Sequence, residues 1–191
     1  GNRYLRGMLT MGGVRFDIND DLKKHILHTL SHVKKDFKEL VNMILGSSSL
    51  LDRLENTGRL FIEMAKELGV VGVAARASGI VTDTRIIHPY AAYDEVDFDI
   101  PIFHYKGDVL ARVRVRIDEV YQSLYIIEQC FDKMAEGPIK TSIRELPPYK
   151  QALSYVESPR GENIYWIMTA PNNRLFRYKV RSPSFCNWPA I

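Results

Sequence analysis

Long apolar runs, cysteines and blocks of like charge are all scarce in this chain of 191 residues. The longest uninterrupted apolar stretch runs from Val70 to Ala75, far short of the roughly 18 residues that a membrane-spanning helix needs. Two cysteines, Cys130 and Cys186, are too few for a disulfide framework or a four-cysteine metal site. Lysine and arginine exceed aspartate and glutamate by only 26 − 23 = 3, and no basic tract predicts binding to nucleic acid.

Apolar residues are nevertheless present in the proportion of a folded, soluble protein. They make up 46% of the chain and charged residues 26%, which is enough to build a hydrophobic core. The chain begins with Gly1 rather than Met, and its last eight residues, 184–191, are largely apolar without a closing turn. We therefore expect residues 1–191 to be a single domain or a fragment of a longer protein.

Helical periodicity dominates the first two thirds of the chain. Asn19 or Asp20 is a good helix N-cap, and Asp108 precedes the longest apolar stripe, which ends at Gly137–Pro138. The predicted helices, within a helical part of about 19–137, cover residues 20–46, 50–54, 62–68 and 109–136. Residues 70–107 carry no sustained period, so they predict a long irregular connection whose aromatic content favours an ordered one.

Alternating apolar and polar residues mark the last third, about 150–182, as β-rich. Residues 152–156, 163–169 and 175–180 are candidate strands, and Pro171-Asn172-Asn173 is a turn between the last two. The sequence therefore predicts an α+β fold, with a helical bundle, a long irregular connection and a small antiparallel sheet.

The few metal-binding residue types have simpler explanations. His28 and His32 have the i, i+4 spacing that can chelate zinc with a third ligand, and His25 lies on the same side of the first helix. A solvated helix flank is the favoured interpretation. Cys130 is expected to act as a small hydrophobic residue on its helix, and Cys186 has no neighbouring histidine or cysteine. We predict no metal site and no cofactor site.

Charged residues in the irregular connection predict an ion-pair network. Arg76, Asp83 and Arg85 are spaced among tyrosines, and any of these charges that becomes buried needs a partner. A structural network that ties the connection to the helices, through Arg112, Arg114 or Arg116, is favoured over a direct catalytic role.

A stiff turn between two predicted strands is the second candidate site. Pro159 fixes its own backbone angle and Gly161 allows a sharp bend, so Arg160 is presented on a rigid turn. A permanent positive charge held in this way suits electrostatic stabilisation at a reaction centre. As a bare pattern, such a turn occurs on many protein surfaces.

These stretches resemble the central part of the large subunit of membrane-bound, energy-converting NiFe hydrogenases of the formate hydrogenlyase type. The chain is similar in the same way to the homologous peripheral-arm subunit of respiratory complex I. The resembling motifs, in family order over nearly the whole chain, are Met11–Val14, Arg76–Gly79, Pro89–Tyr93, Asp97–Pro101, Gly107–Asp108, Gln122–Ser123, Ile126–Gln129, Gly137–Pro138, Ser158–Gly161 and Arg181–Pro183.

The resemblance implies a site beside a metal centre rather than a metal site. In the hydrogenases two Cys-x-x-Cys pairs hold nickel and iron, and this chain contains neither pair. A Ni-Fe centre is therefore expected only in the parent protein, if that protein carries both pairs. The family motif assigns a catalytic role to Arg160, with Pro159 beside it, in polarising hydrogen or assisting proton transfer at nickel.

Two positions favour the hydrogenase branch of the resemblance. Complex I subunits usually carry lysine where this chain has Arg160, and glycine and histidine in their counterpart of residues 184–188. The expected function is proton reduction to hydrogen, with electrons from an iron–sulfur small subunit, on the cytoplasmic side of a membrane-bound complex. A metal-free NADH:quinone oxidoreductase subunit of complex I type and a non-catalytic scaffold module are the alternatives.

Overall fold

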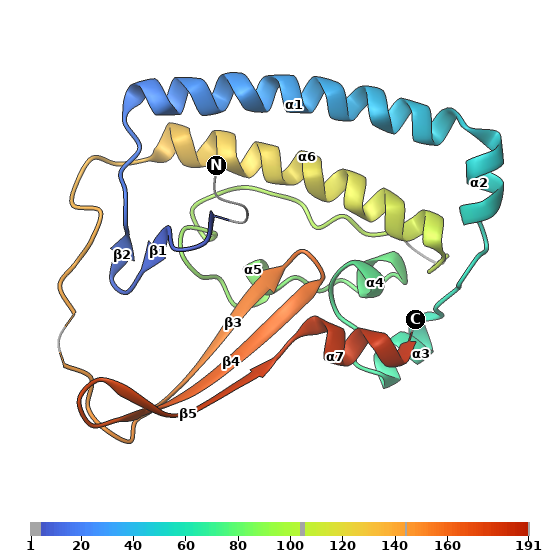
Figure 1. Ribbon diagram of the computed structural model, residues 1–191. Helices are drawn as coiled ribbons and strands as arrows, with labels where there is room; N and C mark the ends of the chain where they lie inside the picture. The colour runs from blue at the N-terminus through green and yellow to red at the C-terminus, as the bar shows by residue number, and fades with distance from the viewer. Residues whose placement is uncertain (1–4, 104–105, 144, 191) are drawn as a thin grey trace.

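The computed structural model describes residues 5–103, 106–143 and 145–190 (Figure 1). Gly1 and Ile191 lie outside these ranges. The elements are β1 (Leu9–Thr10), β2 (Gly13–Val14), α1 (Asp20–Gly46), α2 (Ser48–Leu54), α3 (Ile62–Glu67), α4 (Gly72–Ala77), α5 (Thr84–Ile87), α6 (Val109–Lys133), β3 (Gln151–Ser158), β4 (Gly161–Ala170), β5 (Arg174–Arg181), α7 (Pro183–Asn187) and a final 3-10 turn (Trp188–Ala190). The predicted α+β class is confirmed.

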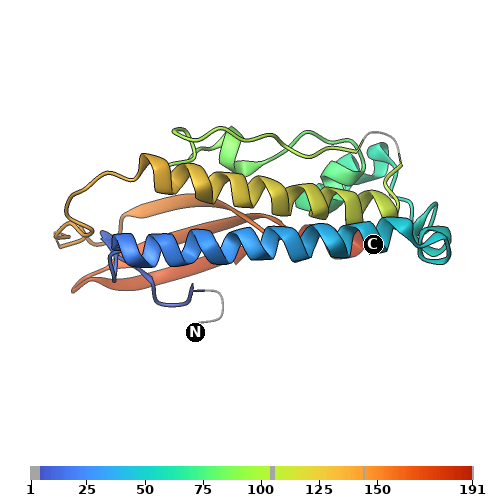
Figure 2. The same ribbon diagram turned by 90° about the horizontal axis from the view of Figure 1, so that it is seen from above.

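Two long helices, α1 and α6, lie side by side across the molecule (Figures 1 and 2). Both begin at the predicted caps. The side chain of Asn19 accepts a hydrogen bond from the backbone N–H of Leu22, and the side chain of Asp108 accepts one from Ala111. Asp108 is fully buried and accepts a second bond from the N–H of Asn56, which ties the start of α6 to the end of α2. Helix α6 ends at Lys133, earlier than predicted.

A narrow strip of side chains joins α1 to α6. Phe37 meets Tyr121 edge to face with ring centroids 5.5 Å apart, and Lys34 lies 3.7 Å from a carboxylate oxygen of Glu128. Val41 is the one buried residue of α1, so the opposite side of this helix is open to solvent. In the described ranges, no helix is both long and apolar enough to cross a lipid bilayer.

The centre of the molecule is the short helix α4, all of whose residues are buried. Val73 and Ala77 of α4 pack against Ala111 and Val115 of α6, and small side chains allow the two helices to approach closely. The sequence pattern predicts no helix in this stretch, and here the prediction is wrong. Six residues are too few to display a helical period, which is why the pattern does not reveal the helix.

Outside α4 and the four-residue helix α5, the described part of the connection is irregular and ordered, as predicted. Its backbone is held along α6 by glutamine side chains, because Gln129 exchanges two hydrogen bonds with the backbone of Asp97 and Gln122 accepts one from Asp99. Phe103 and Gly107 also donate to carbonyls at the end of α4. Amide side chains therefore fix residues 97–99 of this segment on the long helix.

The three predicted strands form one antiparallel sheet in the order β3–β4–β5. Register pairs include Ser158 with Gly161 at the first turn and Ile164 with Arg181 in the outer pair. The apolar end of the chain, for which the sequence predicts no element, folds back as α7 against β4.

Two glycines let α4 and β4 touch. Gly72 and Gly161 both have positive φ angles, +67° and +125°, and a Cβ atom on Gly72 would overlap the carbonyl oxygen of Arg160. The backbones of the buried helix and the sheet turn are therefore in direct contact, which only glycine permits at this position.

We expect Gly72→Ala to destabilise the fold by at least about 2 kcal/mol, because it adds both a backbone clash and an unfavourable φ angle. Urea denaturation of the chain measures this. Gly46→Ala is the matched control, since no atom lies within 4 Å of its added Cβ. Equal stability of the two variants would contradict the close backbone contact.

Candidate functional site

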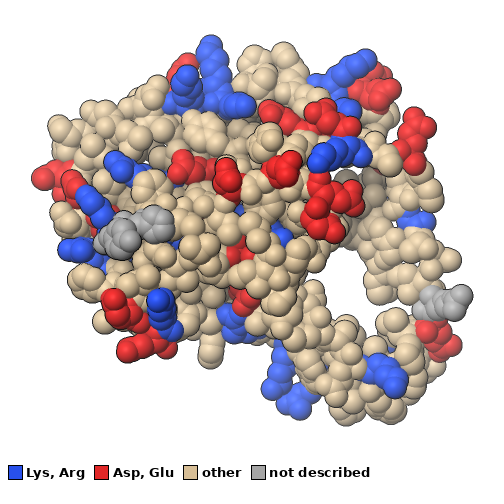
Figure 3. All heavy atoms as spheres, turned by 180° about the vertical axis from the view of Figure 1, so that it is seen from behind, with Lys and Arg blue, Asp and Glu red and all other residues tan. Residues whose placement is uncertain are grey.

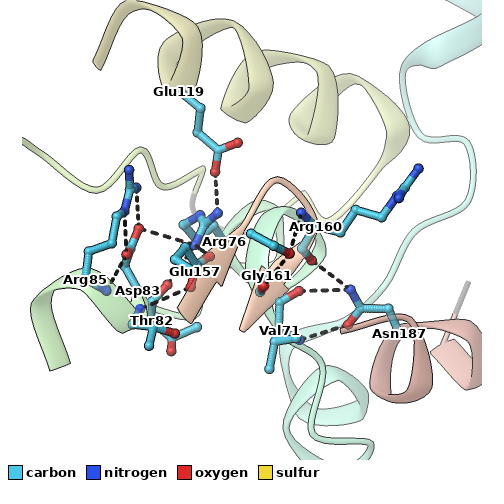
Figure 4. Close-up of polar contacts among 12 residues, drawn as sticks. Val71, Arg76, Thr82, Asp83, Arg85, Glu119, Glu157, Arg160, Gly161 and Asn187 are labelled. Carbon is cyan, nitrogen blue, oxygen red and sulfur yellow. Dashed lines mark hydrogen bonds and ion pairs between the residues drawn. The ribbon is translucent and has the colours of Figure 1, made fainter. Parts of the chain in front are cut away.

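A buried arginine lies at the centre of the candidate site. Arg76, in the last turn of α4, is 1% exposed, and three acidic side chains from different segments surround it (Figure 4). Its guanidinium pairs with Glu119 of α6, with Glu157 of β3 at 3.1 Å and with Asp83 at 3.6 Å. Burying this charge is possible only because these partners replace the water that it loses.

A second arginine completes the group, which we call the Arg76 cluster: Arg76, Asp83, Arg85, Glu119 and Glu157. Arg85 binds Asp83 with two nitrogens, at 2.9 and 2.6 Å, in the bidentate geometry that guanidinium and carboxylate groups favour. Glu157 also accepts from the backbone N–H of Thr84 at 3.1 Å. Two cations therefore face three carboxylates, and the cluster joins α4, α5, α6 and β3.

Burial acts on the proton affinities of groups in and beside the cluster. It raises the pKa of Glu119 above its usual value, and the positive charge of Arg76 opposes that effect. Burial also raises the pKa of Tyr90 to about 12, so its hydroxyl stays protonated near neutral pH. The oxygen of that hydroxyl accepts a hydrogen bond from the backbone N–H of Glu157 at 3.1 Å.

The Arg160 turn, residues 158–161, follows directly from the cluster because Glu157 is next to Ser158. Pro159 and Arg160 are the two residues between strands β3 and β4, as the sequence predicted, and both are exposed. The hydroxyl of Ser158 donates to the carbonyl of Gly161 at 2.8 Å and closes the turn. The side chain of Arg160 extends away from the Arg76 cluster (Figure 4). A catalytic role for Arg160 and Pro159 stays a prediction.

Asn187 of α7 holds the backbone of this turn, and sequence reasoning missed it. Its amide nitrogen donates to the carbonyl oxygens of Arg160 (3.2 Å) and Val71 (3.1 Å), while its oxygen accepts from the N–H of Val71 (2.9 Å). One side chain thus ties together the N-terminus of α4, the sheet turn and α7 (Figure 4). No pattern in the sequence connects Asn187 with Val71, which is 116 residues away.

Two cavities flank the Arg160 turn. The first, about 440 Å³, is lined by Arg160, Ser184, Asn187 and Trp188 together with Arg112 and Arg116 of α6. Its charged lining residues are all arginines, so it favours a negatively charged or electron-rich occupant. The second, about 460 Å³, contains Pro159 and most of the Arg76 cluster. Arg116 borders both, so the turn stands between a cationic and a mixed-charge chamber.

The structure contains the predicted ion-pair network, but the residue of α6 that takes part in it is acidic. The expectation of an anchor through Arg112, Arg114 or Arg116 is wrong for Arg76, whose partner there is Glu119. Arg112 instead donates to the backbone carbonyls of Gly58 (2.6 Å) and Gly107 (3.1 Å). No local pattern pairs Glu119 with Arg76, since 43 residues separate them along the chain.

The remaining candidate residues lie outside the site. His28 and His32 are exposed on α1 with Nε2 atoms 3.2 Å apart, and the described residues contain no group of three or more histidine, cysteine or acidic side chains placed to hold a metal ion. Cys130 is exposed, so its expected role as a small hydrophobic residue is wrong. Cys186 accepts a hydrogen bond from Arg181 at 2.9 Å.

Residues 1–152 match the protein family described as respiratory-chain NADH dehydrogenase, 49 kDa subunit. This match covers most of the chain, which therefore belongs to this family of oxidoreductase subunits. Its relatives include hydrogenase and NADH-quinone oxidoreductase subunits, so the resemblance inferred from the motifs is confirmed at the level of the family.

Individual relatives come from both branches of the family. The chain is 33% identical to formate hydrogenlyase subunit 5 of Escherichia coli (strain K12), covering 100% of this chain and 33% of that protein. It is 35% identical to an NADH-quinone oxidoreductase subunit of Thermosipho melanesiensis, covering 97% of this chain and 52% of that protein. The chain thus spans between a third and about half of these relatives, at similar identity to each.

A solved structure shares the fold. One chain of the membrane-bound sulfane sulfur reductase, described as an archaeal respiratory membrane complex, superposes with a TM-score of 0.84 at 34% identity. The match covers 92% of this chain and 49% of the other. The arrangement of helices and sheet described above is therefore that of a subunit scaffold in this family.

Replacing Arg76 tests the central ion cluster. We expect Arg76→Met to lower the free energy of unfolding by about 3–5 kcal/mol, because three acidic groups lose their shared buried cation. Arg76→Lys should lose less stability than Arg76→Met but remain less stable than the unmodified chain, since it keeps the charge but loses the planar fork of donors. Urea denaturation measures these losses, with Arg53→Met as control because Arg53 is exposed. Equal losses for Arg76→Met and Arg53→Met would refute a structural role of the cluster.

Asn187→Asp tests the clamp on the Arg160 turn. An ionised carboxylate would face the carbonyl oxygens of Arg160 and Val71 without a donor, so we expect a loss of about 1–3 kcal/mol at neutral pH. The loss should shrink as the pH falls, because a protonated carboxyl regains one donor. Asn42→Asp, on the exposed side of α1, is the control in the same denaturation series. A loss that does not change with pH would rule out the clamp.

Proposed function

We propose that this chain is the central part of the catalytic large subunit of a membrane-bound NiFe hydrogenase complex, which reduces protons to hydrogen. The observation that carries this proposal is Arg160, whose backbone is fixed by Asn187 and which lines a cavity of about 440 Å³. A cation carried on a fixed backbone at an open cavity is suited to stabilising negative charge in a reaction. The similarity to formate hydrogenlyase subunit 5 supports the hydrogenase assignment.

The described residues do not fit the ligand set of a nickel–iron centre. Cys130 is exposed on α6 and Cys186 is bonded to Arg181, so they form no thiolate pair. The cysteine ligands of such a centre therefore have to come from parts of the parent protein outside this chain. What this chain contributes is the cationic wall of the cavity, with Arg160, Arg112 and Arg116 as donors.

The proposed place of the parent protein in the cell is based on the complexes that its relatives belong to. The parent would receive electrons from an iron–sulfur small subunit and lie on the cytoplasmic side of the membrane, in the peripheral arm of a multi-subunit complex. A related chain in the membrane-bound sulfane sulfur reductase complex supports this setting. Within the parent, residues 1–191 would be a continuous structural unit, helical over about 19–137 and β-rich over about 150–182.

A complex I type quinone reductase is the second candidate. The family description and the 35% identity to the Thermosipho NADH-quinone oxidoreductase subunit favour it. The parent sequence separates the two candidates. Two Cys-x-x-Cys pairs, one before and one after this segment, are required for the hydrogenase, and their absence would overturn it in favour of quinone reduction or a scaffold role.

Arg160→Lys in the assembled parent complex tests the proposed chemistry. We expect the rate of hydrogen evolution from an artificial electron donor to fall at least about a hundredfold, because the planar guanidinium donors are lost. Subunit composition should stay unchanged, because Arg160 is exposed and its side chain is not part of the Arg76 cluster.

Arg53→Lys is the control, because Arg53 is exposed on α2 and lines neither cavity. Full activity of Arg160→Lys would favour a scaffold role for this chain. Quinone reduction without any hydrogen evolution by the unmodified complex would favour the second candidate.

A further inference from the structure

The outer edge of strand β5 carries no partner strand. Among the described residues β5 pairs only with β4, and in Figure 1 it is the strand farthest from α6. About half of the N–H and C=O groups along its eight residues therefore point outward, as on any edge strand. Such an edge is a ready template for pairing with another chain.

The side chains of β5 are sorted onto two faces. Arg177 pairs in register with Met168, but Thr169 pairs with Leu175, so Phe176 is an extra residue in a β-bulge. This bulge returns Arg174 to the same face as the other basic residues. The cationic face of β5 is Arg174, Arg177, Lys179 and Arg181, and its apolar face is Leu175, Tyr178 and Val180.

Within the described residues, most cations of β5 lack a partner and its apolar side chains are about half exposed. Arg181 pairs with Glu162, but Arg174, Arg177 and Lys179 have no hydrogen-bond or ion-pair partner there. The apolar face is 44–56% exposed. Seen from behind, Lys and Arg side chains project from the lower rim of the molecule, where the sheet extends away from the body (Figure 3). Cationic side chains alone would be enough to prevent unwanted pairing at a free edge. The exposed apolar side chains beside them favour an edge that another chain covers.

We infer that the outer edge of β5 binds an extended acidic segment of a neighbouring subunit, which adds to the sheet as a further strand. This inference rests on the proposed place of the chain in a multi-subunit complex. The segment alternates acidic side chains, which meet the cationic face, with apolar side chains, which cover Tyr178 and Val180. A second copy of β5 is a poor occupant, because antiparallel pairing would set the cations of both strands against one another.

Hydrogen exchange of the β5 amides, measured by mass spectrometry, tests the pairing in the parent protein. We expect peptides that cover residues 174–181 to exchange at least about tenfold more slowly in the assembled complex than in the isolated parent subunit. Exchange that is equally fast in both states would overturn the inference and leave the cations as guards of an open edge. Protection already present in the isolated subunit would also overturn it, because the cover would then be the subunit's own chain.

Charge reversal tests the predicted acidity of the partner. Arg177→Glu combined with Lys179→Glu should remove the protection on assembly and weaken subunit association at least about tenfold. Lys24→Glu combined with Lys35→Glu makes the same change in charge on the exposed side of α1 and should leave association unchanged. Equal association of the two double variants would overturn the inference. Neither measurement reads hydrogen evolution, so failure of the proposed reaction is detected separately.

Discussion

One buried positive charge organises this protein. Arg76 is almost completely removed from water at the end of a helix that is itself entirely buried. An isolated charge in such a place is too unfavourable to persist, so the chain has to bring acidic groups to it from segments far apart in the sequence. Glu119 and Glu157 do this from α6 and β3, and Asp83 does it from the irregular connection. The relative positions of helix, connection and sheet follow from that requirement.

The Arg76 cluster fixes the position of the Arg160 turn. Glu157 is held on two sides, by Arg76 and by the N–H of Thr84, and the turn begins at the next residue. Gly72 lets the backbone of α4 rest against the turn, and Asn187 fixes it from the side of α7. Three independent contacts therefore determine where the Cα atom of Arg160 lies. Catalysis by fixed charges depends on this kind of preorganisation, since a cation that must first be positioned loses part of its effect.

The sequence was informative where structure is local and poor where it is long-range. Helix caps at Asn19 and Asp108, three strands and the Pro159–Arg160 turn follow from patterns within a few residues, and the structure has all of them. The acidic partners of Arg76 on α6 and β3 lie 43 and 81 residues away along the chain, and no local pattern can pair them. The contact of Asn187 with Val71 could not be predicted for the same reason. Helix α4 does not show in the pattern because its six residues are too few to display a period and, being buried on every side, include no polar face.

The backbone of Arg160 is fixed independently of its side chain. The structure holds the carbonyl of Arg160 through Asn187, whereas its side chain borders a cavity and extends away from the Arg76 cluster. A change of side chain at this position therefore alters the charge and geometry presented to the cavity while every contact that builds the turn survives. Replacing arginine by lysine here should leave the fold undisturbed, while a compact ammonium group takes the place of the planar fork of donors. The similar identities to a hydrogenase and to an NADH-quinone oxidoreductase subunit, 33% and 35%, agree with a scaffold whose fold does not depend on the side chain at this position.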